Sequence, residues 1–110
     1  MATEFGFAVI YRARIHPGKE EQYVSAWTRI TETLRRERGG LGSRLHRGTD
    51  GIWYAYAQWP SAKDRTDAFA LGSVDPEAEE QVRDAILESF PEIVLEPVID
   101  LLVSFDRSST

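Results

Sequence analysis

The strongest constraint on the fold is that two segments alternate with a period of two and are apolar on both of their faces. In residues 5–15, one face carries Phe5, Phe7, Val9, Tyr11, Ala13 and Ile15, and the other carries Ala8, Ile10, Arg12 and Arg14. In residues 52–59, one face carries Trp53, Ala55, Ala57 and Trp59, and the other carries Ile52, Tyr54, Tyr56 and Gln58. Such alternation predicts two β-strands. Because large apolar patches are unusual on monomers, both faces of their sheet should be covered.

A long amphipathic helix is predicted between these strands. Apolar residues recur at helical spacing and form one stripe, which consists of Tyr23, Ala26, Trp27, Ile30 and Leu34. Acidic residues open this segment and arginines close it, as the helix dipole favours. The pair Gly39-Gly40 then ends the helix.

The remaining elements follow from turn and capping residues. A short strand over residues 42–47 leads through the hairpin loop of residues 48–51 into the strand of residues 52–59, which Pro60 ends. Ser61 and Asp64 resemble a capping box that starts a short helix carrying Ala62, Ala68 and Phe69.

Asp75-Pro76 starts a third helix, whose buried stripe is Ala78, Val82, Ala85, Ile86 and Phe90. Pro91 closes this helix. A last strand is predicted from about Ile93 to Phe105, interrupted or bulged near Pro97.

The order of these elements predicts the α+β fold class. It is the ferredoxin-like β-α-β-β-α-β arrangement, with a four-stranded antiparallel sheet and helices on one face. One domain is expected over residues 1–110, with a core of about residues 5–105 and a polar tail at 106–110. Because the second sheet face is also apolar, a second copy is expected to cover it, which gives a homodimer by sheet-to-sheet packing.

Composition excludes several classes of function. The 110 residues include no Cys, which rules out disulfides, thiolate nucleophiles and zinc–thiolate sites. The formal net charge of -5 argues against nucleic-acid binding. No signal peptide is visible in Met1–Glu4, and no apolar run is long enough to span a membrane. A cytoplasmic protein is therefore predicted.

The chain resembles the antibiotic biosynthesis monooxygenase (ABM) family, which belongs to the dimeric α+β barrel superfamily. The resemblance covers about residues 6–104, and it rests on the first strand and turn (residues 7–18), the Tyr23/Trp27 helix and the run from Tyr54 to Ser61. It implies a homodimer with a pocket in each subunit between sheet and helices. Some members oxidise polycyclic phenols with molecular oxygen without metal or flavin, some degrade haem, and others are isomerases or have no known activity.

Two departures from the family pattern bear on cofactors. Two groups of members, those that work without a cofactor and those that degrade haem, commonly carry an Asn on the first strand that faces the pocket. This chain has no Asn. Haem degraders also need an axial His on the helix after the Trp, whereas residues 62–71 contain none. We therefore expect no haem or other cofactor. The two histidines lack the spacing of a metal site, so no metal is expected either.

Trp59 stands where the family places a pocket Trp. With Trp53, Ala55 and Ala57 it can form a flat slot for an aromatic ligand. The alternative is that Trp27 and Phe90 fill this slot as ordinary core.

The candidates for proton removal are His46 and Tyr11. An imidazole near its normal pKa suits abstraction of a phenolic proton, and Tyr11 shares the face of Phe7 and Val9. The alternative for His46 is a surface residue on an edge strand.

Four further residues lie on the opposite face. Tyr54 and Tyr56 can donate hydrogen bonds to a phenol or quinone. A place in an interface between subunits fits them better, because an apolar ring with a polar tip is favoured there. Arg12 and Arg14 can form ion pairs with acidic groups of a partner subunit, such as Glu96 of the partner subunit or Asp100 of the partner subunit. Alternatively, they can form a site for an anionic ligand.

Three functions remain open. The first is a cofactor-independent monooxygenase-like enzyme acting on a small aromatic or quinol-type substrate. The second is a non-catalytic or isomerase-like ligand binder on the same scaffold. The third is a module that only dimerises.

Overall fold

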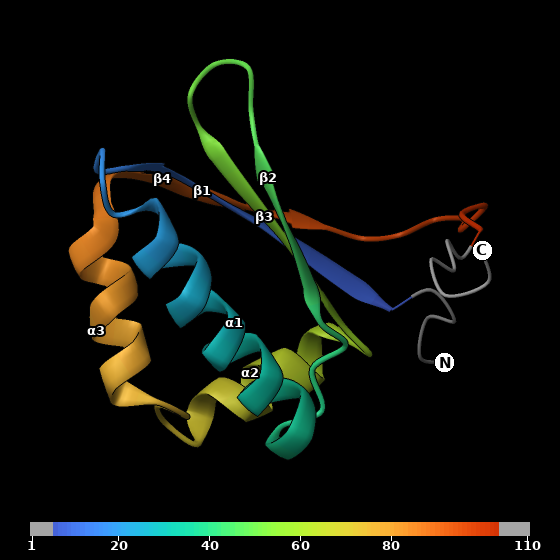
Figure 1. Cartoon of the computed structure of the whole chain (residues 1–110). Helices are drawn as coiled ribbons and strands as arrows, with labels where there is room; N and C mark the ends of the chain where they lie inside the picture. Colours follow the sequence, from blue (N-terminus) through green and yellow to red (C-terminus); the bar gives the residue numbers. More distant parts are fainter. Residues whose placement is uncertain (1–5, 104–110) are drawn as a thin grey trace, which may run out of the picture.

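A computed structural model describes residues 6–103, and within them the chain forms four strands and three helices. Along the chain these are β1 (Phe7–Ile15), α1 (Glu20–Glu37), β2 (Ser43–Arg47), β3 (Trp53–Trp59), α2 (Ala62–Ala70), α3 (Pro76–Ala85) and β4 (Ile86–Leu95). The strands form one antiparallel sheet in the order β2-β3-β1-β4 (Figure 1). This topology confirms the predicted ferredoxin-like fold.

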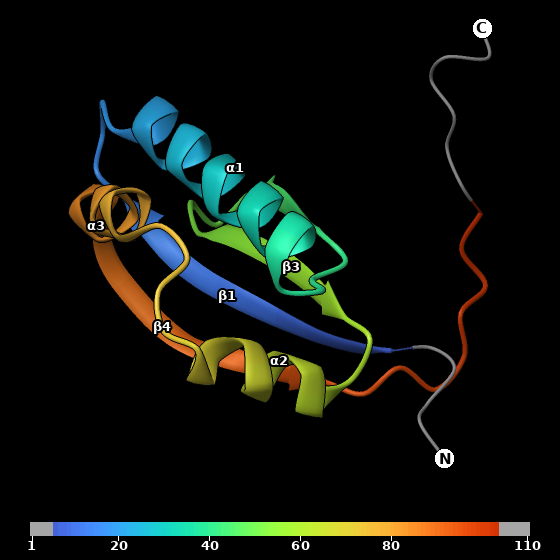
Figure 2. The same cartoon turned by 90° about the horizontal axis from the view of Figure 1, so that it is seen from below.

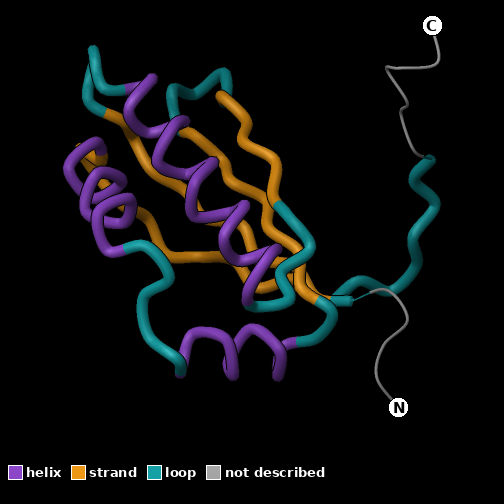
Figure 3. Tube along the Cα trace, turned by 60° about the horizontal axis from the view of Figure 1, so that its bottom comes forward, coloured by secondary structure: helices purple, strands orange, loops and turns teal. Residues whose placement is uncertain are grey.

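The three helices lie on one side of the sheet (Figures 1 and 2). Helices α1 and α3 pack against each other, whereas α2 packs against β3 and lies apart from that pair (Figure 3). We call the helix side the inner face; it carries Tyr11, whose ring contacts Trp27 of α1. The outer face carries Ile10 and Arg12, which pair across the ladder with Tyr56 and Tyr54. No helix covers the outer face in residues 6–103.

The core lies where α1 and α3 meet the inner face. Its fully packed cluster consists of Ala13, Ile15, Tyr23, Trp53 and Ala85. The rings of Tyr23 and Trp53 meet edge to face with centroids 5.6 Å apart, a favourable arrangement for aromatic pairs. Burial raises the pKa of Tyr23 to about 12, so its phenol stays protonated.

Capping residues act as their local sequence predicts. The backbone N–H of Asp64 donates to the Ser61 hydroxyl over 3.1 Å at the start of α2. The N–H of Ala78 donates to the Asp75 carboxylate over 3.0 Å at the start of α3. Helix α1 ends just before Gly39, whose φ of +81° is a conformation that glycine adopts without strain.

The third helix is shorter than the sequence predicts. It ends at Ala85, and Ile86 already has extended dihedrals, so Ile86 and Phe90 belong to β4 and not to a helix. Apolar residues four apart fit a helical stripe, but here β1 offers backbone groups for pairing, and Ile86 pairs with Ile15. Pairing with the sheet therefore overrides the local helical pattern.

The prediction for the last strand is wrong in position. Strand β4 spans Ile86–Leu95 and not residues 93–105, and residues 96–103 form no regular element, so no bulge occurs at Pro97. The irregularity lies instead at Pro91, where two residues of β4 oppose one residue of β1. Pro91 is tolerated because β4 is an edge strand, and its carbonyl accepts a hydrogen bond from Arg12 over 3.0 Å.

Some sequence predictions fall on residues 1–5 and 104–110, which lie outside the described residues. These include the placement of Phe5, the end of the predicted core at residue 105 and the polar tail at 106–110. The extent of the single domain over residues 1–110 stays a prediction.

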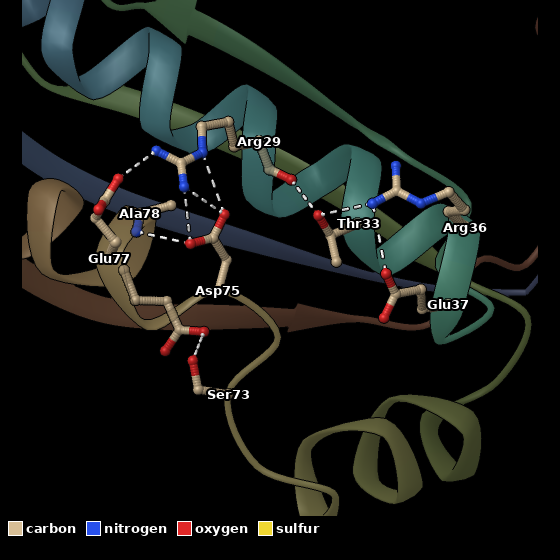
Figure 4. A network of polar contacts seen from close by, with 9 residues as sticks. Arg29, Thr33, Arg36, Glu37, Ser73, Asp75, Glu77 and Ala78 are labelled. Atoms are coloured by element: carbon tan, nitrogen blue, oxygen red, sulfur yellow. Dashed lines mark hydrogen bonds and ion pairs between the residues drawn. The ribbon is translucent and has the colours of Figure 1, made fainter.

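A polar network ties α1 to the start of α3 (Figure 4). Arg29 donates from Nε and Nη2 to the two oxygens of Asp75, at 3.2 and 3.0 Å, and from Nη1 to Glu77 at 3.0 Å. Asp75 also caps α3 through Ala78, so one carboxylate serves both the cap and the contact between helices.

Replacing Asp75 with alanine is expected to lower the free energy of unfolding by about 1 kcal/mol, the usual effect of losing an N-cap. Urea unfolding followed by circular dichroism measures this change. Glu77→Ala is the matched control, because Glu77 contacts the same arginine but its side chain is 73% exposed. An equal loss in both variants would contradict the capping role.

Candidate functional site

A cavity of about 690 Å³ lies between the inner face of the sheet and the three helices. Its wall is mostly aromatic and aliphatic, and all three helices and all four strands contribute to it. The volume falls within the usual range for pockets that hold small organic molecules. The lining residues include Tyr11, Trp27, Ala57, Trp59, Arg65 and Phe69.

Two aromatic pairs shape the wall. Tyr11 and Trp27 meet edge to face with centroids 5.7 Å apart, and Trp59 and Phe69 do the same at 5.7 Å. Trp59 is buried at the end of β3, and Ala57 precedes it on the same inner face. The small side chain of Ala57 leaves room between the larger rings. The arrangement suits a flat aromatic molecule.

One of the charged residues in this wall is Arg65 of α2. Its Nη2 donates to the Tyr11 hydroxyl over 3.0 Å and to the Glu92 carboxylate over 2.9 Å. The guanidinium carbon lies 5.0 Å from the centre of the Phe69 ring, a cation–π distance. Arg65 is mostly buried, with 18% of its side chain exposed.

Burial raises the pKa of Tyr11, and this effect outweighs the opposing influence of Arg65. Burial acts to lower the pKa of Arg65, but Tyr11 and Glu92 more than compensate and raise it above its ordinary value. Near neutral pH, the pair is therefore a neutral phenol beside a full positive charge. Because its oxygen accepts from Arg65, the Tyr11 hydroxyl can donate its own hydrogen to a ligand.

A second polar group lies between α1 and β2. The indole N–H of Trp27 donates to the Ser43 hydroxyl over 2.8 Å, and Thr31 bonds the same hydroxyl at 3.0 Å. These bonds fix the orientation of the Trp27 ring. Trp27 thus presents a fixed surface to the cavity.

The structure brings together five of the eight residues proposed from the sequence. Tyr11, Trp27, Ala57, Trp59 and Phe90 all line the cavity, but Phe90 pairs with Arg12, so its ring lies on the outer face. Phe90 lies on β4 and not on a helix, and Arg12 and Arg14 lie over its ring at 5.8 and 6.0 Å.

The other three residues lie elsewhere. Ala55 is fully buried in the sheet, and Trp53 belongs to the core cluster with Tyr23. His46 is exposed on β2 and pairs with Tyr54, which lies on the outer face. Its Nδ1 lies 3.1 Å from the Tyr54 carbonyl oxygen. Within one chain, the sheet therefore separates His46 from Tyr11 and the cavity.

The outer-face tyrosines and arginines lie as the alternation predicts. Tyr54 donates to Asp50 over 2.6 Å, and this bond lowers the pKa of the Asp50 carboxyl. Arg14 forms an ion pair with Glu88 of β4 at 3.5 Å. The predicted contacts of Arg12 and Arg14 with a partner subunit stay predictions.

Sequence reasoning missed Arg65, Phe69 and Glu92. A signal for Arg65 was present, because positions 62, 65 and 69 share one face of the short helix. An arginine on a face otherwise made of Ala62 and Phe69 indicates a buried charge. Glu92 had no such signal, because the sequence pattern predicts that the last strand begins at about Ile93, whereas β4 begins at Ile86.

Within residues 6–103, no three His, Asp or Glu side chains gather as ligands for a metal ion. In that same part of the chain, every helix is too short or too polar to cross a membrane.

Comparison with known proteins gives one family match. The sequence profile of the family described as antibiotic biosynthesis monooxygenase matches residues 6–72, which is more than half of the chain. No protein of curated function matches the sequence.

Several solved structures have the same fold, and the match with this chain extends over nearly the whole length of each of three such structures. A protein from Bordetella bronchiseptica described as a putative antibiotic biosynthesis monooxygenase has a TM-score of 0.71 at 18% identity, covering 86% of this chain and 99% of that one. A similarly described protein from Chloroflexus aurantiacus has a TM-score of 0.68 at 17% identity, and the match covers 89% of this chain and 98% of that one. A variant of SnoaB, a cofactor-independent oxygenase from Streptomyces nogalater, has a TM-score of 0.65 at 18% identity. This match covers 86% of this chain and 95% of that one. At these identities the likeness concerns the fold.

Proposed function

The chain belongs to the antibiotic biosynthesis monooxygenase family, and from this premise we propose that it oxidises a small aromatic or quinol-type substrate with molecular oxygen. The observation that carries the proposal is the cavity of about 690 Å³ walled by Tyr11, Trp27 and Trp59. A cavity of this size and apolar character can exclude water from a bound aromatic molecule.

The proposed reaction needs no bound cofactor, because the substrate itself supplies the electrons. An acidic CH2 group of the substrate loses a proton to a water molecule and becomes a carbanion, which gives one electron to oxygen. The carbon radical and superoxide then combine through a new C–O bond, and the peroxide takes the proton back to give a hydroperoxide. Breaking the O–O bond and losing water leaves a carbonyl, so CH2 and O2 become C=O and H2O. The protein has to orient the substrate and keep the site dry.

The proposal assigns the residues of the cavity as follows. Trp27, Ala57 and Trp59 form the slot for the aromatic rings, and Tyr11 donates a hydrogen bond to a substrate oxygen. In this arrangement Tyr11 acts as a donor and not as a base, because burial raises its pKa. His46 takes no part within one chain, since it lies on the outer face.

Oxygen uptake in the presence of an anthrone or a naphthohydroquinone tests the proposal. Uptake above the buffer rate is expected, and filling the slot with Ala57→Leu is expected to abolish it while the fold is kept. Ala70→Leu is the matched control, since Ala70 is exposed on α2. Absence of uptake across a panel of such substrates would contradict the oxygenase function.

The alternative is a ligand binder or isomerase-like protein. The observation that favours it is that His46, the imidazole predicted from the sequence to remove a proton, does not reach the cavity. A change in tryptophan fluorescence on adding an aromatic ligand, without oxygen uptake, would support this alternative.

We also propose that the protein acts as a homodimer through its outer face. Ile93 and Leu95 of β4 are exposed, and they pair across the ladder with Ile10 and Ala8. Together with Ile10, Tyr54 and Tyr56, the two β4 residues make an apolar surface that no helix covers in residues 6–103, whereas Ala8 is already buried. A second copy related by a two-fold axis would bury the same surface on both chains.

The segment after β4 supports the same proposal. Residues 96–103 extend away from the sheet and helices (Figure 2). Their apolar side chains are strongly exposed, with Val98 at 84% and Val103 at 90%. So many exposed aliphatic residues in one short segment favour contact with a second chain.

A further inference from the structure

Resting on the proposed function, we propose that the cavity selects aromatic molecules that carry an anionic oxygen group, such as a carboxylate or an ionised phenol, and that Arg65 determines this selectivity. Arg65, which the sequence did not single out, lies in the wall of this cavity.

Arg65 is held firmly by its neighbours. Its guanidinium lies over the rings of Phe69 and Tyr11, at 5.0 and 5.8 Å from their centres. Nη2 is bonded to Tyr11 and to Glu92. A guanidinium fixed in this way loses little further freedom when it binds a ligand.

The hydrogen bonds in the protein leave donors of Arg65 available. Arg65 lines the cavity, and its Nη1 forms no hydrogen bond with residues 6–103, because the bonds to Tyr11 and Glu92 all use Nη2. The Nε–H also lacks a partner there, but neighbouring atoms cover it, so Nη1 is the donor that a ligand can meet. An acceptor at Nη1 would gain a charge-assisted hydrogen bond. Carboxylate and phenolate oxygens match guanidinium geometry and carry the complementary charge.

Tyr11 adds a second donor at the same place. Its oxygen accepts from Arg65, so its hydrogen is free to point at a ligand. A positive charge and a phenol O–H therefore meet on one side of a cavity that is otherwise aromatic. That combination suits an aromatic anion better than a neutral aromatic molecule.

Glu92 is the group that competes with such an anion. It forms an ion pair with Arg65 at 2.9 Å, and 41% of its side chain is exposed. Both of its oxygens bond Nη2, at 3.2 and 2.9 Å, which leaves Nη1 uncontested. Its charge still weakens the field of Arg65, so neutralising Glu92 is expected to strengthen anion binding.

The test compares 2-naphthoate, an anion at neutral pH, with 2-naphthamide, a neutral molecule of nearly the same shape. Binding of each is measured by isothermal titration calorimetry on the full chain. The native protein is expected to prefer naphthoate by about tenfold or more, and Arg65→Gln to lose this preference while still binding the amide. Glu92→Gln is expected to bind naphthoate more tightly and the amide unchanged.

Lys63→Gln is the matched control, because it removes one positive charge from the same helix at a side chain that is 83% exposed and outside the cavity lining. It should keep the native preference. Retained amide binding shows that Arg65→Gln is folded; if that variant does not fold, Glu92→Gln decides.

The outcomes separate this inference from the proposed function. Equal binding of the two probes by the native protein, or an unchanged preference in Arg65→Gln, overturns the role of Arg65 and leaves the oxygenase proposal standing. Unchanged naphthoate affinity in Glu92→Gln counts against the inference in the same way. If the native protein binds neither probe, this inference fails, and oxygen uptake with an anthrone still decides the oxygenase proposal.

Discussion

Replacing Trp53 with alanine is expected to lower the free energy of unfolding by about 3–5 kcal/mol. Trp53 is buried in the core cluster, with Tyr23 against one part of its ring and the Arg47 guanidinium 5.0 Å from its centre. Truncation leaves a cavity that α1 and β1 cannot fill without moving. Since single domains are stable by only about 5–15 kcal/mol, the variant should unfold at much lower urea concentration.

This prediction also decides between two roles for Trp53. Trp53→Phe keeps most of the packing, so it should keep most of the stability and bind aromatic ligands as the native protein does. If Trp53→Phe instead lost ligand binding at unchanged stability, Trp53 would be a pocket residue after all. All variants have to be compared at one protein concentration, because association would contribute to stability.

Replacing Ile10 with aspartate is expected to convert the protein from a dimer into a monomer. Ile10 lies on the outer face of the central strand β1, opposite Tyr56. An aspartate buried in this interface would be desolvated without a partner, at a cost of several kcal/mol for each subunit, which should separate the two chains. Sedimentation equilibrium should give twice the chain mass of 12.5 kDa for the native protein and the chain mass itself for the variant.

Two further variants make this measurement decisive. Thr28→Asp puts the same charge on the exposed face of α1 and should remain a dimer. Ile93→Lys alters an exposed edge-strand residue and should weaken the dimer even if Ile10→Asp does not fold. A native mass of 12.5 kDa that does not change with concentration would contradict the dimer.

The two-sided apolar sheet links the fold to both proposals. Its inner face forms the cavity with the helices, and its outer face is left for a second chain. The oxygenase and anion-selectivity proposals depend on the inner face, and the dimer depends on the outer face. A change at Arg65 should therefore leave the oligomeric state unchanged, and a change at Ile93 should leave the ligand preference unchanged.

Local sequence signals determined much of this architecture. The strand alternation, the stripe of α1 and the caps at Ser61 and Asp75 all act within a few residues, so they can be read without knowing the fold. The same signals placed Tyr11, Trp27, Ala57 and Trp59 on surfaces that meet at the cavity.

Only the tertiary structure decided where α3 ends and which charges meet. The apolar spacing of Val82, Ile86 and Phe90 fits a helix as well as a strand, and pairing with β1 makes the choice. Whether His46 shares a face with Tyr11 depends on the register between β2 and β3, since a shift of one residue would move the His46 side chain to the other face of the sheet. Arg65 meets Tyr11 across 54 positions of sequence, a contact that folding creates and no local pattern contains.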